Sequence, residues 1–261
     1  MTVTTLVAGV FGAFLRWLQL RTIYDAETNL PRAWAGISVI LVVYILLFAL
    51  ALIGVIVFRL RIRVVRPLAA ERALRARTPI PSVLVWLFCA AFAAGGLVLL
   101  FSEKSAATQM ENTLGTLFRA GCIIAGSCVL CLPWREGKES AFPGRLGSGV
   151  LTLFFCIWLV HSYLKNSRDP VSWDFLPELL SVTASTMGIY YITAYYFGRA
   201  KPRSAVFWSF FAALLNICTI FDLMTGAEKL LHAATAGTLL LMGFLLVENM
   251  RKAPTGPGIR G

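Results

Sequence analysis

Long apolar runs limit what this chain can fold into more than any other feature of its sequence. A helix needs about 18 or more apolar residues to cross about 30 Å of hydrocarbon, because each residue adds about 1.5 Å. Eight runs of roughly this length follow one another, at 4–20, 36–58, 82–101, 114–133, 147–164, 178–197, 204–222 and 230–248. No stretch between them is long enough for a soluble domain. The sequence therefore predicts an all-α, polytopic integral membrane helix bundle of about eight transmembrane helices.

The runs extend almost to the end of the chain, so we expect one transmembrane helical domain over 1–251. The remaining residues, 252–261, read KAPTGPGIRG and predict a disordered cytoplasmic tail, because they are rich in proline and glycine. The first run leaves a second topology open, since Arg16 interrupts it. If this run re-enters the membrane instead of crossing it, seven spans remain.

Basic residues are concentrated in the short connection 59–79, where the only acid is Glu71. Short loops rich in arginine and lysine stay on the cytoplasmic side of a membrane. The sequence therefore predicts cytoplasmic termini and a multi-pass protein of the cell (cytoplasmic) membrane. It also predicts that this connection contacts the headgroups of anionic lipids on the cytoplasmic face. The residues expected to do so are Arg59, Arg61, Arg63, Arg66, Arg72, Arg75 and Arg77.

The net charge of +11 does not require a nucleic-acid partner, because the topology already explains it. Nucleic-acid binding needs a basic face on a soluble module, and we expect no such partner. The chain contains no P-loop, dinucleotide fingerprint or HExxH motif. The sequence therefore predicts no cofactor and no metal, and favours a protein without enzymatic activity. The preference for arginine over lysine and the lack of an Asn-x-Ser/Thr sequence are typical of a bacterial protein.

Several ionisable side chains fall inside the predicted spans, and the topology places them in the outer third of the membrane. They are Arg16, Arg119, His161, Asp222, Glu228 and His232. Such groups are costly in a membrane and usually face the interior of a bundle or a wet cavity. We therefore regard each of them as a candidate functional residue.

Arg16 and Arg119 each lie on a stripe of small residues along one helix face. Gly9 and Gly12 precede Arg16 at helical spacing, and Gly115 precedes Arg119 by four residues. Small residues mark the places where membrane helices pack closely. We therefore expect both guanidinium groups to point into the bundle.

Together these positions predict a polar cavity that opens outward and binds a ligand. Its residues are Arg16, Arg119, Asp222, Glu228 and His232. Guanidinium groups bind carboxylate or phosphate with two parallel hydrogen bonds, so the expected ligand is a small anion. A structural alternative stays open for Arg119, whose side chain can reach the headgroups. It can also pair with an acid of the chain, and the candidates are Glu111, Glu178 and Asp222.

The polar cavity favours a small-solute permease or solute-binding membrane protein. A transport pathway usually leaves polar groups across the full thickness of the membrane, whereas here they stop in the outer third. The alternative is therefore a non-catalytic membrane sensor, an assembly factor or a subunit of a larger complex with a membrane protein partner.

Overall fold

The computed structural model describes residues 1–22, 36–60, 70–76, 78–101, 109–133, 142–166, 172–222 and 224–252. Every element in these residues is helical, which confirms the all-α class. The predicted tail from 253 onward lies outside the described residues, as does the side chain of Arg59. The same holds for four other predicted lipid contacts, Arg61, Arg63, Arg66 and Arg77.

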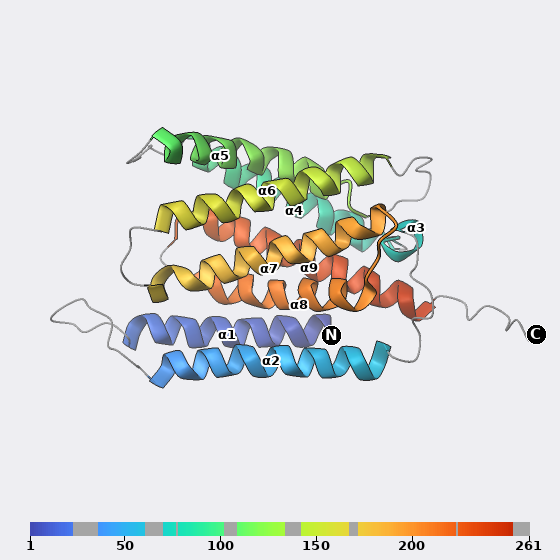
Figure 1. Ribbon diagram of the computed structural model, residues 1–261, viewed down its shortest axis with the longest axis horizontal. Coiled ribbons are helices and arrows are strands. Elements are labelled where there is room, and N and C mark those ends of the chain that lie inside the picture. Colours follow the sequence, from blue (N-terminus) through green and yellow to red (C-terminus); the bar gives the residue numbers. More distant parts are fainter. Residues whose placement is uncertain are drawn as a thin grey trace, which may run out of the picture.

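Eight long helices correspond to the eight apolar runs. They are α1 (Thr2–Thr22), α2 (Gly36–Leu60), α4 (Pro79–Phe101), α5 (Gln109–Val129), α6 (Phe142–Asn166), α7 (Ser172–Tyr196), α8 (Pro202–Cys218) and α9 (Gly226–Lys252). Two short elements complete the described chain, α3 (Ala70–Ala73) and the 3-10 helix η1 (Thr219–Phe221). The long helices lie roughly parallel (Figure 1).

Six of the described helices are long and apolar enough to cross a membrane by themselves: α1, α2, α4, α6, α8 continued by η1, and α9. The chain is therefore a helical, membrane-embedded bundle. α5 and α7 are comparably long but are not among these six, and both lie between other helices of the bundle. α1 is one unbroken helix of 21 residues, which fits a span better than a re-entrant segment. The total of eight spans and the cytoplasmic termini remain predictions.

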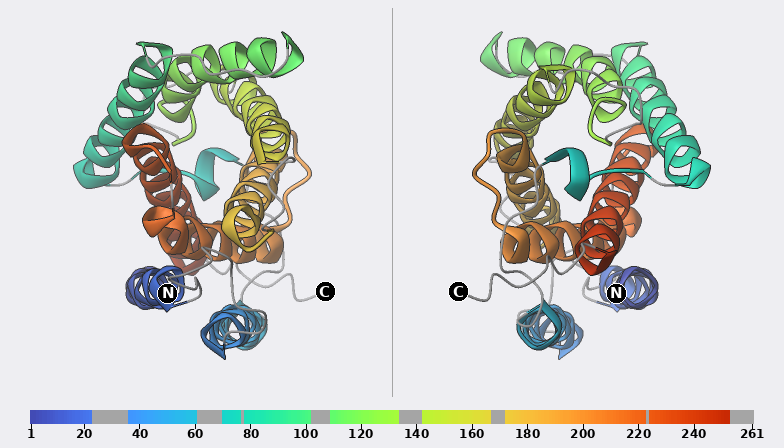
Figure 2. Two further views of the ribbon diagram at one scale, coloured as in Figure 1. Left: turned by 90° about the vertical axis from the view of Figure 1, so that its left-hand side faces the viewer. Right: turned by 90° about the vertical axis from the view of Figure 1, so that its right-hand side faces the viewer.

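Helices α4 to α9 form a closed ring. Each packs against the next in sequence, and α9 returns to pack against α4 (Figure 2). α6 and α9 are not neighbours in this ring and face each other across it. α1 and α2 lie outside the ring, where both contact α8.

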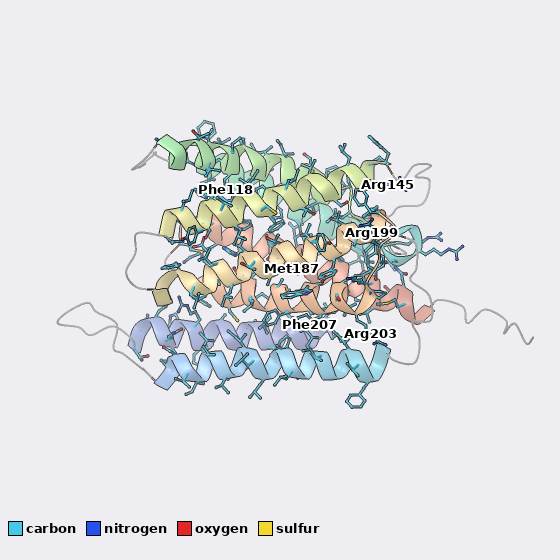
Figure 3. The ribbon with its side chains drawn as sticks, viewed as in Figure 1. Phe118, Arg145, Met187, Arg199, Arg203 and Phe207 are labelled. Atoms are coloured by element: carbon cyan, nitrogen blue, oxygen red, sulfur yellow. The ribbon has the colours of Figure 1, made fainter. Side chains whose placement is uncertain are left out.

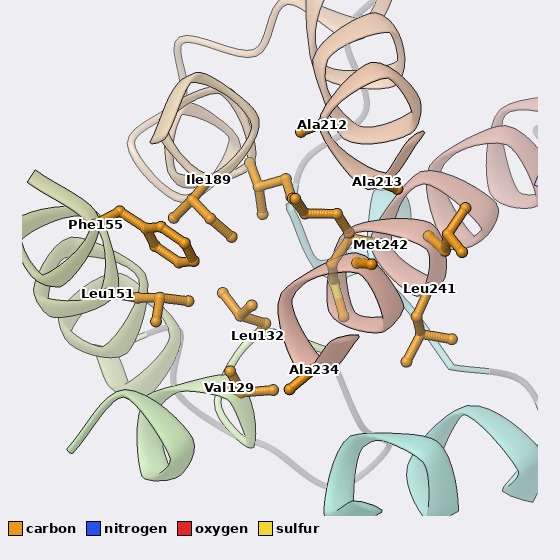
Figure 4. Close-up of a cluster of buried hydrophobic side chains, with 14 of the residues drawn as sticks. Val129, Leu132, Leu151, Phe155, Ile189, Ala212, Ala213, Ala234, Leu241 and Met242 are labelled. Carbon is orange, nitrogen blue, oxygen red and sulfur yellow. The ribbon is translucent and has the colours of Figure 1, made fainter. Parts of the chain in front are cut away.

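Apolar side chains fill the middle of the ring (Figure 4). Leu151 and Phe155 of α6 meet Ile189 of α7 and Met242 of α9, and each is at most 1% exposed. An interior packed in this way leaves a solid core, because side chains in cores interdigitate with few voids.

One end of the bundle is basic, and we call it the basic end. Arg145, Arg199 and Arg203 gather there (Figure 3), beside the N-terminus and the short helix α3. Arg72 and Arg75 are exposed on and just after α3. Their contact with anionic lipid remains a prediction, and we call the opposite end of the bundle the far end.

The basic end of the ring is closed by chain segments that fold into it. Ala73 and Leu74 are fully buried there, and the Asn249 side-chain amide of α9 donates hydrogen bonds of 3.1 and 3.0 Å to the carbonyls of Ala73 and Arg75. The turn after α5 also folds inward, where the Tyr196 hydroxyl donates a hydrogen bond to the Leu132 carbonyl. The ring is therefore plugged by chain segments at its basic end.

The boundary predicted for the fourth span is wrong, because α5 ends at Val129 instead of continuing to 133. The chain turns at this point, and the backbone N–H of Leu132 donates to the Val129 carbonyl at 3.2 Å. Pro133 accounts for the early end. Proline disfavours helical backbone at the residue before it, and it has no N–H to continue the helix.

Glycines let α1 lie close to α8. A Cβ atom at Gly9 would lie 2.8 Å from Ile217 Cδ1, and one at Gly12 would overlap Cys218 Sγ. The Tyr44 hydroxyl of α2 donates a 2.6 Å hydrogen bond to the Ala8 carbonyl, which fixes α2 to α1. The small-residue stripe of α1 therefore packs against the ring, as its spacing predicts.

Candidate functional site

The five predicted ligand-binding residues lie at the far end, but in three separate places. Arg16 and Asp222 pair where α1 meets the end of η1. Glu228 and His232 lie on α9, in the wall of the ring. Arg119 lies on α5, which packs against α4 and α6.

Arg16 is held by a buried network of side chains from α1, η1 and α2. Its Nε donates to Asp222 Oδ1 at 2.5 Å, and its Nη1 donates to Gln19 Oε1 at 2.8 Å. Gln19 in turn donates from Nε2 to Ser38 Oγ at 2.8 Å. Arg16 and Asp222 are each only 2% exposed. The prediction that Arg16 points into the bundle is therefore confirmed.

The 3-10 turn that ends α8 places Asp222 beside α1. The Asp222 N–H donates to the Thr219 carbonyl at 3.0 Å, and its backbone is extended, so the helix stops there. Since groups of the chain surround the guanidinium of Arg16, this pair joins α1 and α2 to the ring. It serves the structure whether or not a ligand is bound.

Arg119 is partly exposed, and both its guanidinium and the ring of His161 of α6 lie close to Gly115. A Cβ atom at Gly115 would lie 4.0 Å from Arg119 Nη2 and 3.5 Å from His161 Cε1. The guanidinium thus extends back along α5 towards the far end, the direction expected of a side chain that reaches for the headgroups. Asp222 binds Arg16 instead, and Arg119 takes part in neither ion pair between described side chains.

His232 ends a chain of buried hydrogen bonds from three helices. Its Nδ1 lies 2.8 Å from Asn216 Oδ1, and Asn216 Nδ2 donates to Ser185 Oγ at 2.7 Å. Ser185 Oγ donates to the Ser181 carbonyl at 2.7 Å. The carbonyl can only accept, so Ser185 accepts from Asn216, and the Asn216 oxygen is left to accept from His232. His232 therefore carries a proton on Nδ1, and in the neutral ring Nε2 is an acceptor.

The Nε2 atom of His232 has no hydrogen-bond partner within the described part of the chain, although the side chain is 0% exposed. The two ring nitrogens of imidazole diverge, so Nε2 points away from Asn216 and α8. Buried polar atoms without a partner are uncommon, because their desolvation is not compensated. This atom is therefore a candidate contact for a ligand.

Two layers of side chains connect α6 and α9 across the far end of the ring. In the outer layer, Lys165 Nζ lies 2.5 Å from Glu228 Oε1. In the inner layer, the rings of Trp158 and His232 lie 5.0 Å apart at 56°. His232 follows Glu228 by four residues, so it lies about 6 Å deeper along α9 on the same face.

Glu178 of α7 adds a second carboxylate to the outer layer. It is 7% exposed and accepts hydrogen bonds from Ser162 Oγ at 2.6 Å and from Asn166 Nδ2 at 3.3 Å. Lys165 interacts electrostatically with both Glu178 and Glu228. We call these three residues the charge cluster, which combines two carboxylates with one ammonium.

Glu228 has a structural role besides its ion pair. Its Oε2 accepts hydrogen bonds of 3.0 Å from the backbone N–H and from the hydroxyl of Thr225, and its own N–H donates to that hydroxyl at 3.3 Å. These hydrogen bonds form a capping box at the start of α9, and the spacing Thr-x-x-Glu indicates it in the sequence. The Glu228 carboxylate is therefore held in place by its own helix.

Sequence reasoning missed Lys165, Ser162 and Trp158 as members of this site. The partners of Lys165 and Trp158 lie on α9, which is distant in sequence, and the partner of Ser162 lies on the next helix, α7. No local pattern encodes such pairs. Lys165 lies in the last turn of α6, where a lysine is ordinarily a favourable charge at a helix C-terminus. Trp158 is flanked by apolar residues in the sequence, so nothing there distinguishes it from an ordinary core residue.

We expect Asn216→Leu to lower the free energy of unfolding by about 1–3 kcal/mol, because it leaves the buried Nδ1–H of His232 without an acceptor. Thr183→Val is the control, since Thr183 is exposed on α7 and bonds only its own helix. It should change stability by less than about 0.5 kcal/mol. Thermal unfolding in detergent micelles compares the two, and equal stabilities would contradict the assigned role of Asn216.

No protein-family model, no curated protein and no solved structure matches this chain. The far end of the ring is therefore the basis for assigning a function. It combines a buried imidazole nitrogen, an aromatic layer and a charge cluster within a membrane-embedded helical bundle.

Proposed function

We propose that this multi-pass membrane protein is a solute-binding protein whose site lies inside the far end of the ring. The observation that carries the proposal is the Nε2 atom of His232, which is buried and without a partner in the described residues. A solute that reaches this atom would satisfy it and would rest against Trp158.

The charge cluster is the entrance to the proposed site. Lys165 is 39% exposed and Glu228 is 13% exposed, so the pair lies at the surface of the far end. Ion pairs exposed in this way contribute about 0–1 kcal/mol, because water screens them and long side chains lose entropy. The pair can therefore open at little cost.

Binding without passage is the better supported form of this function. Below Trp158 the ring is packed with apolar side chains, and its basic end is plugged by α3 and the turn after α5. A receptor-like solute sensor needs only the entrance to open. A small-solute permease, the second candidate, also needs the packed half of the ring to open.

In this proposal the basic end faces the cytoplasm and the far end faces outward. The arginine-rich connection then lies against anionic headgroups, with Arg72 and Arg75 as its described members. A polybasic segment gains about 1 kcal/mol per basic residue near such a surface. Thr225 is exposed at the far end. A cysteine introduced at this position should react with a membrane-impermeant reagent from the outside of sealed vesicles if the far end faces outward.

Thermal unfolding in nanodiscs against a broad set of amines, alcohols, carboxylates, phosphates and sugars tests the proposal. A solute at about one hundred times its dissociation constant should stabilise the wild-type protein by about 2.7 kcal/mol. His232→Leu should abolish this gain, whereas Leu230→Ala, at a more exposed position of α9, should retain it. If no compound stabilises the protein, or if His232→Leu responds like the wild type, the proposed site is wrong.

Uptake of the stabilising solute into proteoliposomes separates the two candidate functions. A receptor should bind the solute and leave the internal concentration unchanged. Accumulation that depends on His232 would favour the permease.

A further inference from the structure

We propose that the solute is an organic ammonium ion, and that the Lys165 side chain occupies its position as an intramolecular competitor. The inference rests on the proposed binding function, and it names the chemistry that the same site selects. It differs from the anion expected from Arg16 and Arg119, since Arg16 is bound by Asp222 and Gln19, and Arg119 lies on α5, which contributes no residue to the charge cluster.

The balance of charge at the entrance favours a cation. Glu178 and Glu228 both interact with Lys165, and when both carboxylates are ionised they exceed the single ammonium by one negative charge. Glu178 is buried, and carboxylates placed in such surroundings attract cations more strongly than they do in water. An anion would be repelled by the same pair.

The direction of the buried hydrogen bonds also favours a solute that donates a hydrogen bond to His232. The chain from Ser181 through Ser185 and Asn216 places the proton of His232 on Nδ1, so Nε2 offers a lone pair. With the ammonium in the place of Lys165 at the entrance, a hydroxyl of the same solute can donate to that lone pair. A carboxylate or a phosphate can bind there only if the fully buried imidazole becomes charged, which its desolvation opposes.

Trp158 provides an apolar and aromatic surface at the same depth. Its ring lies 5.0 Å from that of His232 and is 2% exposed. Tryptophan is the aromatic side chain that attracts cations most strongly, and the attraction grows when water is excluded. The aliphatic part of an organic ammonium ion can pack on the same ring.

Lys165 already shows how an ammonium group is held at the entrance. Its Nζ contacts Glu228 Oε1 at 2.5 Å, and the Glu228 carboxylate is fixed by the capping box with Thr225. Because Lys165 is partly exposed on a flexible stem, an incoming ammonium ion can replace it. The released side chain then moves into solvent.

The ammonium group can belong to a free amine or to the headgroup of a lipid in the surrounding leaflet. Ethanolamine represents the chemistry that the two sources share. Nanodiscs of phosphatidylglycerol, which has no ammonium group, measure the free amine alone. Nanodiscs that also contain phosphatidylethanolamine measure the lipid, which should compete with added ethanolamine if the site accepts a headgroup.

The test measures stabilisation of the protein in phosphatidylglycerol nanodiscs by three compounds of similar size. They are ethanolamine, ethylene glycol and glycolate, which are cationic, neutral and anionic. We expect ethanolamine to bind most tightly. Stabilisation by glycolate and not by ethanolamine would overturn this inference and leave the proposed binding function intact. If none of the three binds, the inference is wrong. The thermal-unfolding measurement with the broad set of solutes then tests the binding function separately.

Two variants test the role of the charge cluster. Lys165→Gln removes the competitor and should tighten ethanolamine binding by up to about fivefold, a difference near 1 kcal/mol. Glu228→Gln should weaken binding by about the same factor, while its amide oxygen can still serve the capping box. Lys201→Gln, which removes a lysine at the basic end, is the control and should bind as the wild type does. Weaker or unchanged binding by Lys165→Gln would contradict competition.

Discussion

Asp222→Ala is expected to destabilise the protein by about 3–5 kcal/mol, because it leaves the guanidinium of Arg16 buried without its counter-charge. Gln19 remains as a hydrogen-bond partner but supplies no negative charge. Since net stabilities of domains are of the order of 5–15 kcal/mol, a loss of this size is a large fraction of the whole. Thermal unfolding in detergent micelles measures it, and α1 and α2 should be the first helices to become accessible to protease.

The matched control removes both charges together. Arg16→Met combined with Asp222→Leu leaves no buried charge, and such replacements are often neutral or stabilising. Recovery of most of the lost stability would assign the effect to the unpaired charge. Lys165→Gln provides the contrast, because breaking that exposed pair should cost at most about 1 kcal/mol. If Asp222→Ala unfolds like the wild type, the pair does not hold α1 to the ring.

Gly126→Leu is expected to force α4 and α5 apart. A Cβ atom at Gly126 would lie 2.8 Å from the Cys89 carbonyl oxygen, a backbone atom that moves only with its helix. Overpacking of this kind costs about 1–3 kcal/mol or more, which outweighs the gain of up to about 1 kcal/mol from replacing a helical glycine. Because α4 and α5 are consecutive members of a closed ring, the whole ring must adjust.

Gly149→Leu is the control for this substitution. A Cβ atom at Gly149 of α6 would meet nothing within 4 Å, so only the gain in helix propensity remains. We expect this variant to be at least as stable as the wild type in the same unfolding measurement. Equal destabilisation of both variants would show that the close contact at Gly126 does not determine the effect.

The sequence predicts the helices well because membrane burial leaves a strong local signal. All eight apolar runs lie within or overlap a long helix, and most helices continue a few residues beyond the run. At the end of α5 the helix stops short of its run, where a Leu-Pro pair lies inside an apolar stretch and ends the helix before the hydropathy falls. Backbone stereochemistry decides that boundary, and hydropathy alone does not register it.

The sequence also predicts that Arg16 faces the bundle, since glycines at helical spacing mark its packing face. It does not reveal which acid the arginine meets. Asp222 is 206 residues away, and the choice between Asp222 and Glu178 depends on how the ring closes. For the same reason the entrance pair of Lys165 and Glu228 could not be predicted, because α6 and α9 are brought face to face only by the helices on either side of them.

The separation of Arg16 from Asp222 has a consequence for how the protein is made. The ribosome adds about 5–20 residues per second, so about 10–40 s pass between synthesis of the arginine and synthesis of its partner. During this time α1 and α2 have no α8 to dock on, and the charge of Arg16 must be shielded by water, by headgroups or by the insertion machinery. The hairpin of α1 and α2 is therefore made before the ring but reaches its final place only after α8 has been made.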